Sequence, residues 1–283
     1  MALDFVDRRY SHPPIASAAP PIDEAGALSA RLAKTPRERI AAQALRYQVF
    51  YQEMAAIPTP MQSMLRRDYD RFDALCDHLI LTVNGPAEGV TAAARLETGE
   101  TVIGCYRLLM GARAQDGFYS AQEFDLTPLL DGVGRGLNIL ELGRSCIAPT
   151  YRSKHAIDRL WRGLYAYIQA HSVDVLMGCA SFPTLDVASL AAPLSLLHYN
   201  FSAPAPWRVR AQASKFIAMD QLSRHGFDER QALRALPPVL RGYIRAGCMV
   251  GDGAVIDANF GTTDVFVLLP LQQATERYVA HYS

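Results

Sequence analysis

The segment Gly136–Ile168 constrains the fold of this chain more than any other stretch. Residues 137–147 have the apolar character of a buried strand, and the basic turn 151–155 leads from it into a helix. Apolar residues recur at the helical spacings i, i+3, i+4, i+7 and i+11, at Ile157, Leu160, Trp161, Leu164 and Ile168. Cationic side chains at a helix N-terminus favour anions. The segment therefore predicts a phosphate-binding turn beside a group-transfer site.

Two charged residues, Glu141 and Arg144, interrupt the apolar strand. A buried acid is costly unless it is paired, hydrogen-bonded or used in chemistry. In a regular strand the two side chains point to opposite faces. They share a site only if a β-bulge intervenes, and we predict that bulge at Gly143.

Length, charge and cysteine content narrow the class of protein. The 283 residues allow one large domain or two ordinary ones, and a net charge of zero argues against general nucleic-acid binding. The five cysteines are scattered without a Cys-x-x-Cys pair, which favours reduced thiols in a cytoplasmic protein over a catalytic cysteine. The sequence shows no secretion signal and no apolar run of about 18–20 residues. We expect a soluble or at most peripheral protein.

The rest of the chain divides into an arm and one domain. The residues before position 35 are rich in proline, alanine and serine, so we predict a flexible arm over 1–34. A capping box with proline at the first helical position, Thr35-Pro36-Arg37-Glu38, predicts a helix over 36–54. We assign residues 35–283 to a single domain with a C-terminal extension.

Short apolar runs supply the remaining strands of the predicted sheet. Residues 76–83 and 101–110 predict an antiparallel pair, and 175–182 a strand parallel to 137–147 in a βαβ unit. Further expected elements are helices at 183–197 and 237–247, a tight turn at Gly251-Asp-Gly, a strand at 265–269 and a C-terminal helix. The pattern predicts an α/β fold with a mixed central sheet, flanking helices and C-terminal elaboration.

These features resemble the N-acetyltransferase (GNAT) superfamily, in which a mixed, mostly antiparallel sheet carries a phosphate-binding turn after its fourth strand. Arg152 matches that family's turn motif, whereas His155 and Ile157 occupy its two glycine positions. Glycines there let the backbone approach a pyrophosphate. Their absence favours a donor with a single phosphate, the phosphopantetheine arm of acyl carrier protein, over coenzyme A.

A second resemblance is to the acyl-homoserine-lactone synthases, which are shorter enzymes that take acyl chains from acyl carrier protein. The residues that carry it are Arg46, Phe50, Glu53, Asp70, Asp73, Arg107, Glu141 and Arg144. The resemblance implies that Arg46, Phe50, Glu53, Asp73, Arg107 and Arg144 order the acceptor pocket. A structural ion-pair network is the alternative interpretation of these charges.

From about residue 35 to the C-terminus the chain is most similar to the L-ornithine Nα-acyltransferase family. The matching segments are 140–147 with Tyr151-Arg152, Leu160-Trp161, 178–182, Leu236-Pro-Pro and 249–264. This resemblance implies transfer of a long-chain (3-hydroxy) acyl group from acyl carrier protein to the α-amine of L-ornithine, giving lyso-ornithine lipid. It implies no tightly bound cofactor, and the donor arm is phosphopantetheine.

Amide formation requires a base near the thioester, and we predict Glu141 in that role, because an apolar strand favours a carboxylate that takes up a proton. The alternative is a structural partner for Arg107 or Arg144. The acids suited to the side-chain ammonium of ornithine are Asp73, Asp257 and Asp264, and an arginine suits its carboxylate.

Arg152 and Lys154 are the predicted phosphopantetheine and carrier contacts. With Arg144, Arg159 and Arg162 they form a carrier-protein patch, or else belong to a solvated helix face. No His, Cys and Asp spacing suggests a metal site. Residues 238–246 either touch an anionic membrane or pack into the core.

Three alternatives remain open at the level of function. One is acylation of another amine, such as glycine, glutamine or a homoserine-derived signal. Another is a GNAT-like module that binds carrier protein or membrane without catalysis. The third is a coenzyme A-dependent acyltransferase, which His155 and Ile157 disfavour.

Overall fold

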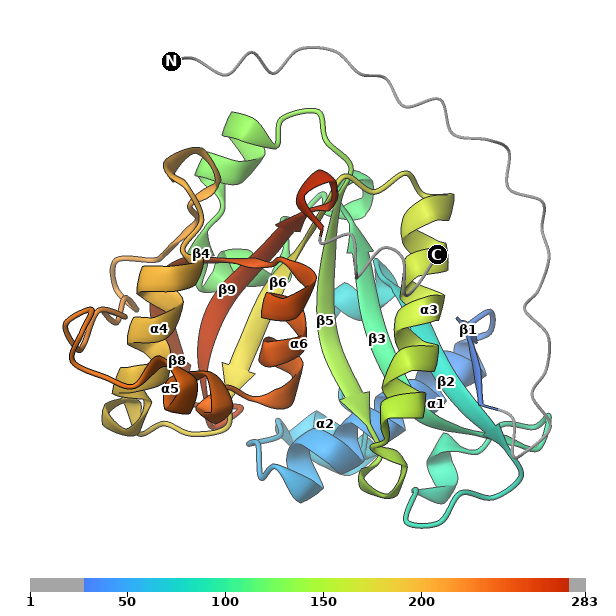
Figure 1. The fold of residues 1–283 in the computed structure, drawn as a ribbon. Helices are drawn as coiled ribbons and strands as arrows, with labels where there is room; N and C mark the ends of the chain where they lie inside the picture. Colours follow the sequence, from blue (N-terminus) through green and yellow to red (C-terminus); the bar gives the residue numbers. More distant parts are fainter. Residues whose placement is uncertain (1–27, 275–283) are drawn as a thin grey trace.

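The computed structural model describes residues 28–274, which form one nine-stranded sheet with helices on both faces (Figure 1). The strands lie in the order β1-β2-β3-β5-β6-β9-β8-β7-β4. Their bounds are β1 Ser29–Leu32, β2 Asp77–Asn84, β3 Glu100–Met110, β4 Phe124–Asp125, β5 Ile139–Ile147, β6 Val175–Phe182, β7 Arg210–Ala211, β8 Met249–Asp257 and β9 Thr262–Pro270. Only β5–β6 and β7–β8 pair in parallel among these strands. The predicted mixed, mostly antiparallel sheet is confirmed.

Helices pack against both faces of the sheet. Their bounds are α1 Pro36–Tyr47, α2 Pro60–Leu65, α3 Lys154–Ala170, α4 Ala191–Phe201, α5 Glu229–Ala235 and α6 Pro238–Ala246. In β2, Leu79 and Leu81 pack with α3 whereas Ile80 packs with α1. Because neighbouring strand residues point to opposite faces, α1 and α3 lie on opposite sides of the sheet (Figure 1). We call these the α1 face and the α3 face.

The predicted start of α1 is confirmed by its capping contacts. The Glu38 N–H donates to Thr35 Oγ1 at 3.2 Å, and the Thr35 N–H donates to Glu38 Oε2 at 3.0 Å. The helical path continues beyond α1 as a π-helix, Gln48–Glu53, so the predicted extent to about residue 54 is also right. The wider π turn brings Phe50 into the core beside α1.

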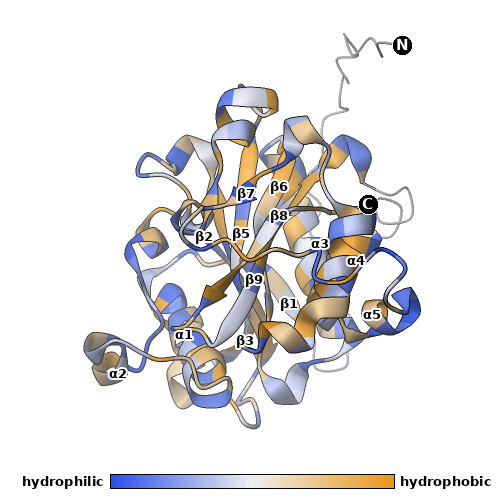
Figure 2. Ribbon diagram, turned by 90° about the vertical axis from the view of Figure 1, so that its left-hand side faces the viewer, coloured by the Kyte–Doolittle hydropathy of each residue, from blue (hydrophilic) through white to orange (hydrophobic). Residues whose placement is uncertain are grey.

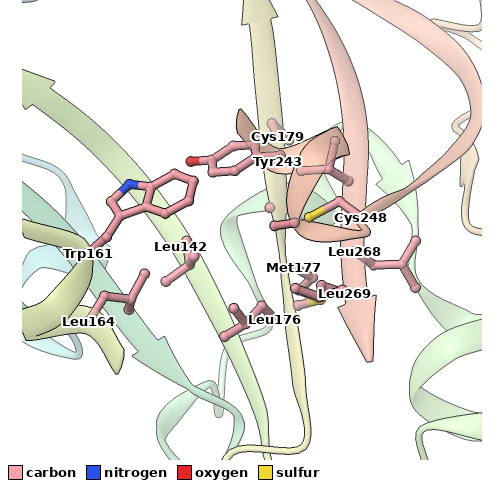
Figure 3. A pocket seen from close by; sticks show the side chains of 13 residues that line it. Leu142, Trp161, Leu164, Leu176, Met177, Cys179, Tyr243, Cys248, Leu268 and Leu269 are labelled. Carbon is pink, nitrogen blue, oxygen red and sulfur yellow. The ribbon is translucent and has the colours of Figure 1, made fainter. Parts of the chain in front are cut away.

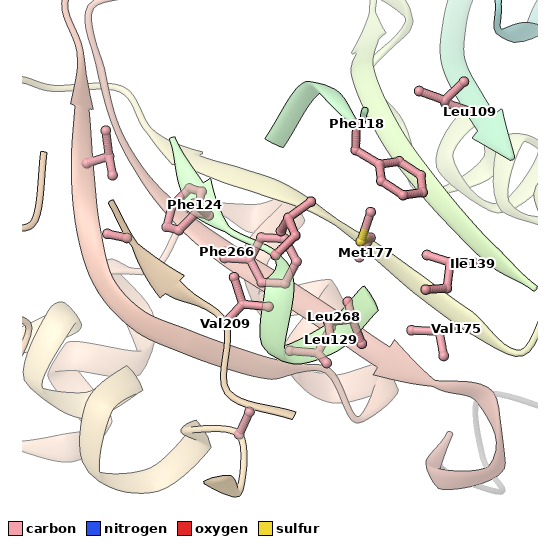
Figure 4. Packing of buried hydrophobic residues seen from close by; sticks show 14 of the residues in the cluster. Leu109, Phe118, Phe124, Leu129, Ile139, Val175, Met177, Val209, Phe266 and Leu268 are labelled. Atoms are coloured by element: carbon pink, nitrogen blue, oxygen red, sulfur yellow. The ribbon is translucent and has the colours of Figure 1, made fainter. Parts of the chain in front are cut away.

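The middle of the α1 face is covered by the chain between β3 and β5. Phe118, Phe124 and Leu129 from this chain pack on Met177 of β6 and Phe266 of β9 (Figure 4). These side chains are almost fully buried. The covering segment is thereby fixed against the sheet, and it carries residues 119–123 to the place where β5, β6 and β9 lie side by side.

Two sequence-based expectations differ from the structure. Residues 29–32, which we placed in the flexible arm, form β1, because they pair with β2 and Arg31 binds Glu38 and Glu100. Residues 1–27 of the predicted arm lie outside the described residues. The turn expected at Gly251-Asp-Gly is a register shift inside the longer strand β8, whose partner β9 lies close enough to complete a ladder.

After the last strand, Leu271–Gln273 form a single 3₁₀ turn. The C-terminal helix expected beyond the last strand falls on residues 275–283, which lie outside the described part of the chain.

Candidate active site

Six of the charged residues around α1, β3 and β5 form one cluster on the α1 face. This Arg–Asp network consists of Arg46, Asp68, Asp70, Asp73, Arg107 and Arg144. Arg46 donates to Asp68 at 2.7 Å and to Asp73 at 2.6 Å, and Arg107 donates to Asp70 at 2.7 Å and to Asp73 at 3.3 Å. Three positive charges thus face three negative ones. Asp68 was not among the residues that the sequence singled out.

The centre of the Arg–Asp network is dry. Arg46 and Asp68 are each 1% exposed, a depth at which an unpaired charge would be very costly. Burial alone would raise the pKa of Asp73, but Arg46 and Arg107 outweigh it, and the pKa lies below its usual value. Asp73 is therefore committed to two arginines, which makes it a poor partner for a substrate ammonium group.

Arg144 lies in the bulge that the sequence analysis required. The β3–β5 register passes from Arg107 opposite Gly143 to Cys105 opposite Cys146, so Tyr106 alone faces two residues of β5. The bulge is confirmed one residue beyond the predicted Gly143, and Arg144 takes the left-handed conformation with φ of 50°. As a result, Arg144 lies on the same face as Glu141.

The Arg144 guanidinium is held between two aromatic rings. It lies 4.7 Å from the ring centre of Tyr119 and 4.5 Å from that of Phe260. Its Nε is 3.3 Å from Asp68 Oδ2 but has no hydrogen-bond partner among the described residues. Phe50, another predicted pocket residue, contacts Phe260 edge to face and so supports this arrangement from behind.

Glu141, the predicted base, is 4% exposed and accepts three hydrogen bonds. The Tyr119 N–H donates to Oε2 at 2.8 Å, while the N–H and the hydroxyl of Ser120 donate to Oε1 at 2.7 and 2.6 Å. Its partners are therefore the covering segment rather than Arg107 or Arg144. These three bonds hold the carboxylate in one position. The sequence carried no signal for Ser120.

Three further acids meet beside this point, and we call them the acid cluster. Glu123, Asp257 and Asp264 each offer a carboxylate oxygen within 4.8 Å of the others. Burial and the neighbouring Asp264 and Asp257 raise the pKa of Glu123 to about 7. Burial also raises the pKa of Asp264. The sequence suggested Asp257 and Asp264 but not Glu123, which reaches them only through the covering segment.

The acid cluster lacks the cations that balance the Arg–Asp network. In the part of the chain that the structure describes, no lysine or arginine forms a salt bridge with these three acids. Lys215 and Arg144 act on Glu123 and Asp264 only at longer range. Such a group of carboxylates suits a metal ion or an ammonium group.

An apolar cavity opens where β5 and β6 separate (Figure 3). The two strands pair only through Ile139–Glu141 and Val175–Met177, although both continue well beyond. At the point of separation a Cβ on Gly178 would lie 2.4 Å from the Leu142 carbonyl oxygen, so only glycine fits. The cavity has a volume of about 40 Å³ and is partly open to solvent. Its lining consists of Leu142, Trp161, Leu164, Leu176, Met177, Gly178, Cys179, Tyr243, Ala246, Cys248, Val267, Leu268 and Leu269.

Two aromatic residues from α3 and α6 wall the cavity on the α3 face. Trp161 and Tyr243 stack with ring centres 6.0 Å apart, and the Tyr243 hydroxyl lies 3.0 Å from that of Tyr106. Leu240 and Ala246 of α6 are buried, so this helix packs against the core. The membrane contact that we considered for residues 238–246 is not supported by this packing.

The cavity reaches the polar groups of the α1 face through one side chain. Cys179 lines the cavity, and its Sγ lies 3.5 Å from Ser120 Oγ and 3.8 Å from Glu123 Oε2. Burial raises the pKa of the Cys179 thiol well above its usual value, which argues against a nucleophilic thiolate.

The predicted phosphate-binding turn contains an ion pair. Arg152 donates to both carboxylate oxygens of Glu53, at 2.5 and 2.7 Å, and to the Ile147 carbonyl at 3.0 Å. Glu53 thus lies with Arg152 and not with the other predicted pocket residues. Lys154 begins α3 and is exposed, and the Ser153 hydroxyl caps the helix by accepting from the Ala156 N–H.

Sequence comparisons identify relatives along nearly the whole chain. Residues 45–162 match the family model described as an acetyltransferase (GNAT) domain, in agreement with the predicted fold class. The L-ornithine N(alpha)-acyltransferase of Brucella abortus (strain 2308) is 42% identical over 260 residues, which cover 91% of this chain and 89% of that protein. The protein of the same name from Rhizobium meliloti (strain 1021) is 40% identical over 289 residues, covering 99% and 94%.

Among solved structures, an N-acyl amino acid synthase from uncultured soil microbes aligns with 89% of this chain and 97% of its own. The TM-score is 0.43 and the identity is 12%. The acyl-homoserine-lactone synthase LasI aligns with 85% of this chain and 88% of its own, with a TM-score of 0.42 and 15% identity.

Proposed function

The chain belongs to the L-ornithine N(alpha)-acyltransferase family, and from this premise we propose that it transfers an acyl group from a thioester to the α-amine of ornithine. One observation carries the proposal. Cys179 lines the apolar cavity between β5 and β6 and also contacts Ser120 and Glu123, so the cavity and the polar α1 face meet at one residue. A thioester in the cavity and an amine on the α1 face would come together there.

The donor's acyl chain and pantetheine arm would occupy the apolar cavity. Its aliphatic and aromatic lining offers apolar contacts to an acyl chain, and the cavity would have to widen to hold a long one. Where β5 no longer pairs with β6, backbone N–H groups are available to stabilise the oxyanion that develops on the thioester carbonyl. A long chain with a 3-hydroxyl group is what the resemblance to the family implies for the donor.

Acyl carrier protein is the proposed donor, with its single phosphate at the N-terminus of α3. Arg152 and Lys154 stand at that end of the helix, whereas His155 and Ile157 occupy the positions where glycines would admit a pyrophosphate. The test is a direct comparison of acyl carrier protein and coenzyme A thioesters of the same acyl chain. A kcat/KM that is higher for the coenzyme A thioester would overturn this choice.

The acceptor's carboxylate would bind Arg144. This guanidinium is positioned by the bulge and by the rings of Tyr119 and Phe260, and its Nε is without a hydrogen-bond partner among the described residues. Arg46 and Arg107 would act as positioning residues, because the aspartates of the Arg–Asp network already occupy them.

Proton transfer would run through Ser120 to Glu141. The Ser120 hydroxyl donates to Glu141 and lies 3.5 Å from the Sγ of Cys179, which lines the cavity, so it could accept a proton from the ornithine ammonium while passing its own to the carboxylate. The neutral amine then attacks the thioester carbonyl, the C–N bond forms and the C–S bond breaks. The amine's second proton neutralises the departing thiolate, and Glu141 returns the first proton to solvent.

An assay with one acyl carrier thioester and a panel of amino acids tests the function. Ornithine should be the preferred acceptor, with the amide product identified by mass spectrometry. If glycine, glutamine or a homoserine derivative is preferred, that amine replaces ornithine as the proposed acceptor. Carrier binding without acylation of any amine would instead indicate a non-catalytic module.

The lipid product suggests a membrane contact, and an exposed apolar surface around α2 supports one. Met54, Ile57, Met61, Met64 and Leu65 are 37–68% exposed on a segment that projects from the protein (Figure 2). Arg66 and Arg67 follow directly. Exposed apolar side chains next to basic ones suit the surface of an anionic membrane.

None of the helices in residues 28–274 has the length and apolar character needed to cross a bilayer. If the exposed apolar surface around α2 contacts the membrane, cosedimentation with phosphatidylglycerol vesicles should depend on it, and a Met61→Gln, Met64→Gln variant should bind them less. Equal binding of both proteins would rule this surface out.

A further inference from the structure

We propose that the acid cluster binds the side-chain ammonium group of the acceptor and so restricts the enzyme to diamino acids. The inference rests on the proposed function, since it assumes that an amino acid lies on the α1 face. It goes further by assigning Glu123, Asp257 and Asp264 to the part of the acceptor that does not react.

The geometry of the cluster matches the donors of an ammonium group. Three carboxylate oxygens from the covering segment, β8 and β9 converge within 4.8 Å, and an ammonium group has three N–H donors to offer them. Asp257 and Asp264 stand on neighbouring antiparallel strands, where Asp257 is opposite Thr262. Side chains of Thr262 and Asp264 therefore point to the same side of β9.

Two buried oxygens without hydrogen-bond partners point independently to a missing ligand. Asp264 is 7% exposed, and its Oδ1 has no hydrogen-bond partner among the described residues. Thr262 is 3% exposed, and its Oγ1 likewise meets no partner in hydrogen-bond geometry, although Ser181 and Thr262 lie near enough to Asp264 to oppose the rise of its pKa. Buried oxygens without partners are uncommon and costly, so a hydrogen-bond donor that binds here would be stabilised by both oxygens.

The negative charge of the acid cluster indicates that the missing hydrogen-bond donor is a cation that keeps its proton. Three adjacent acids without a salt bridge favour a bound positive charge and oppose its deprotonation. The α-amine has to lose a proton before it can attack, which makes this environment unsuitable for the nucleophile. The side-chain ammonium of ornithine remains charged throughout the reaction and so fits the cluster.

The position of the acid cluster allows the α-amine of ornithine to lie at the cavity while the side-chain ammonium group lies at the cluster. Ser120 and Cys179 mark the reacting end beside the cavity, and Glu123 is 3.8 Å from Cys179 on the other side. Beyond Glu123, Asp264 and Asp257 lie on β9 and β8, one and two strands away from β6. An amino acid with its α-amine at Ser120 would extend its side chain over β9 towards these acids.

Norvaline provides the sharpest test, because it has the carbon chain of ornithine but lacks the terminal amine. The experiment measures kcat/KM for both amino acids with the acyl carrier thioester, using the full-length protein and its Asp264→Asn and Glu123→Gln variants. Wild type should favour ornithine by at least about tenfold, since norvaline leaves the buried acids unpaired. Each variant should lose at least about tenfold with ornithine while norvaline changes by less than about twofold.

Asp252→Asn is the matched control. Asp252 lies on β8 outside the cluster and pairs with Arg210, so this variant should keep the wild-type preference for ornithine. Thermal unfolding of each variant establishes that it is folded. If Asp264→Asn fails to fold, Glu123→Gln carries the test.

Three outcomes would overturn the inference. Equal loss of both substrates in a folded variant would show that the cluster has a structural role. Loss of the ornithine preference after chelation, with recovery on adding Mg²⁺, would show that the acids hold a metal ion. A wild-type enzyme that acylates ornithine and norvaline equally would show that the side chain is not recognised, whereas one that acylates neither would remove the proposed function itself.

Discussion

The Arg–Asp network and the acid cluster lie on the same face of the sheet but differ in how their charge is balanced. The network sets three arginines against three aspartates, whereas no lysine or arginine of residues 28–274 forms a salt bridge with the three acids of the cluster. Buried charges that neutralise one another require no ligand for stability. An uncompensated group gains most from a ligand. The network is therefore mainly scaffold, in which Arg144 alone is proposed to meet the substrate, whereas the cluster as a whole is suited to bind one.

The same contrast appears in the protonation of the carboxyl groups. Arg46 and Arg107 overcome the effect of burial and hold the pKa of Asp73 below its usual value. Burial and two neighbouring acids raise the pKa of Glu123 to about 7. Removing a charge should therefore destabilise the network and stabilise the unliganded cluster.

The largest expected effect is that of Arg46→Ala. This change leaves Asp68 and Asp73 buried without their shared partner, and we expect the free energy of unfolding to fall by about 3–5 kcal/mol. Urea denaturation measures it. The control Arg39→Ala, on an exposed position of the same helix, should change stability by less than about 0.5 kcal/mol. Equal effects of the two substitutions would contradict the assignment of the network as scaffold.

Glu123→Gln should act in the opposite direction and depend on pH. The folded carboxyl group, with its pKa of about 7, holds a proton that the unfolded chain releases near 4.5, so wild type loses stability as pH rises from 4.5 through 7. The variant lacks this loss and should be more stable than wild type by about 2–3 kcal/mol at pH 8, with little difference at pH 4.5.

Urea denaturation without substrate, at several pH values, measures the difference between the two proteins. Glu88→Gln, at an exposed acid, should show no such trend. A Glu123→Gln variant that is less stable than wild type at pH 8 would show that the acid cluster is not destabilised by the charge of Glu123.

Ser120→Ala tests the groups that lie between the network and the cluster. It removes the hydroxyl that connects Glu141 to the cavity but retains both backbone hydrogen bonds to the carboxylate. We expect kcat to fall about 10- to 100-fold and stability to change by about 1 kcal/mol. Steady-state kinetics at saturating ornithine provides the measurement. An unchanged kcat would exclude the proposed proton path.

The smallest expected effect belongs to the exposed pair at the turn before α3. Glu53→Gln removes a partner of Arg152 that is about one-third exposed, and the free energy of unfolding should change by less than about 1 kcal/mol. The freed guanidinium should bind the donor phosphate more easily, lowering KM for the acyl carrier thioester by up to about fivefold. A rise in KM would show that Glu53 assists donor binding instead.

Much of the fold could be predicted because its signals are local. The apolar stripe of α3, the capping box of α1 and the apolar run of β5 each depend on residues within a few positions. The bulge beside Arg144 was also predictable, since two charges in one buried strand can share a face only if the alternation is interrupted. Strand β8 was not recognised, because Gly251 and Gly253 conceal its alternation until β9 pairs with it.

The sequence by itself determined most of the long elements, the placement of Glu141 and Arg144 on β5, and the family of the chain. Only the tertiary structure decided which charges meet: Arg152 with Glu53, Glu141 with Ser120, and Glu123 with Asp257 and Asp264. The physical reason is that helix and strand signals act over a few residues. Contacts between charged side chains depend instead on strand order, register and the path of the covering segment, which bring together residues far apart in the chain.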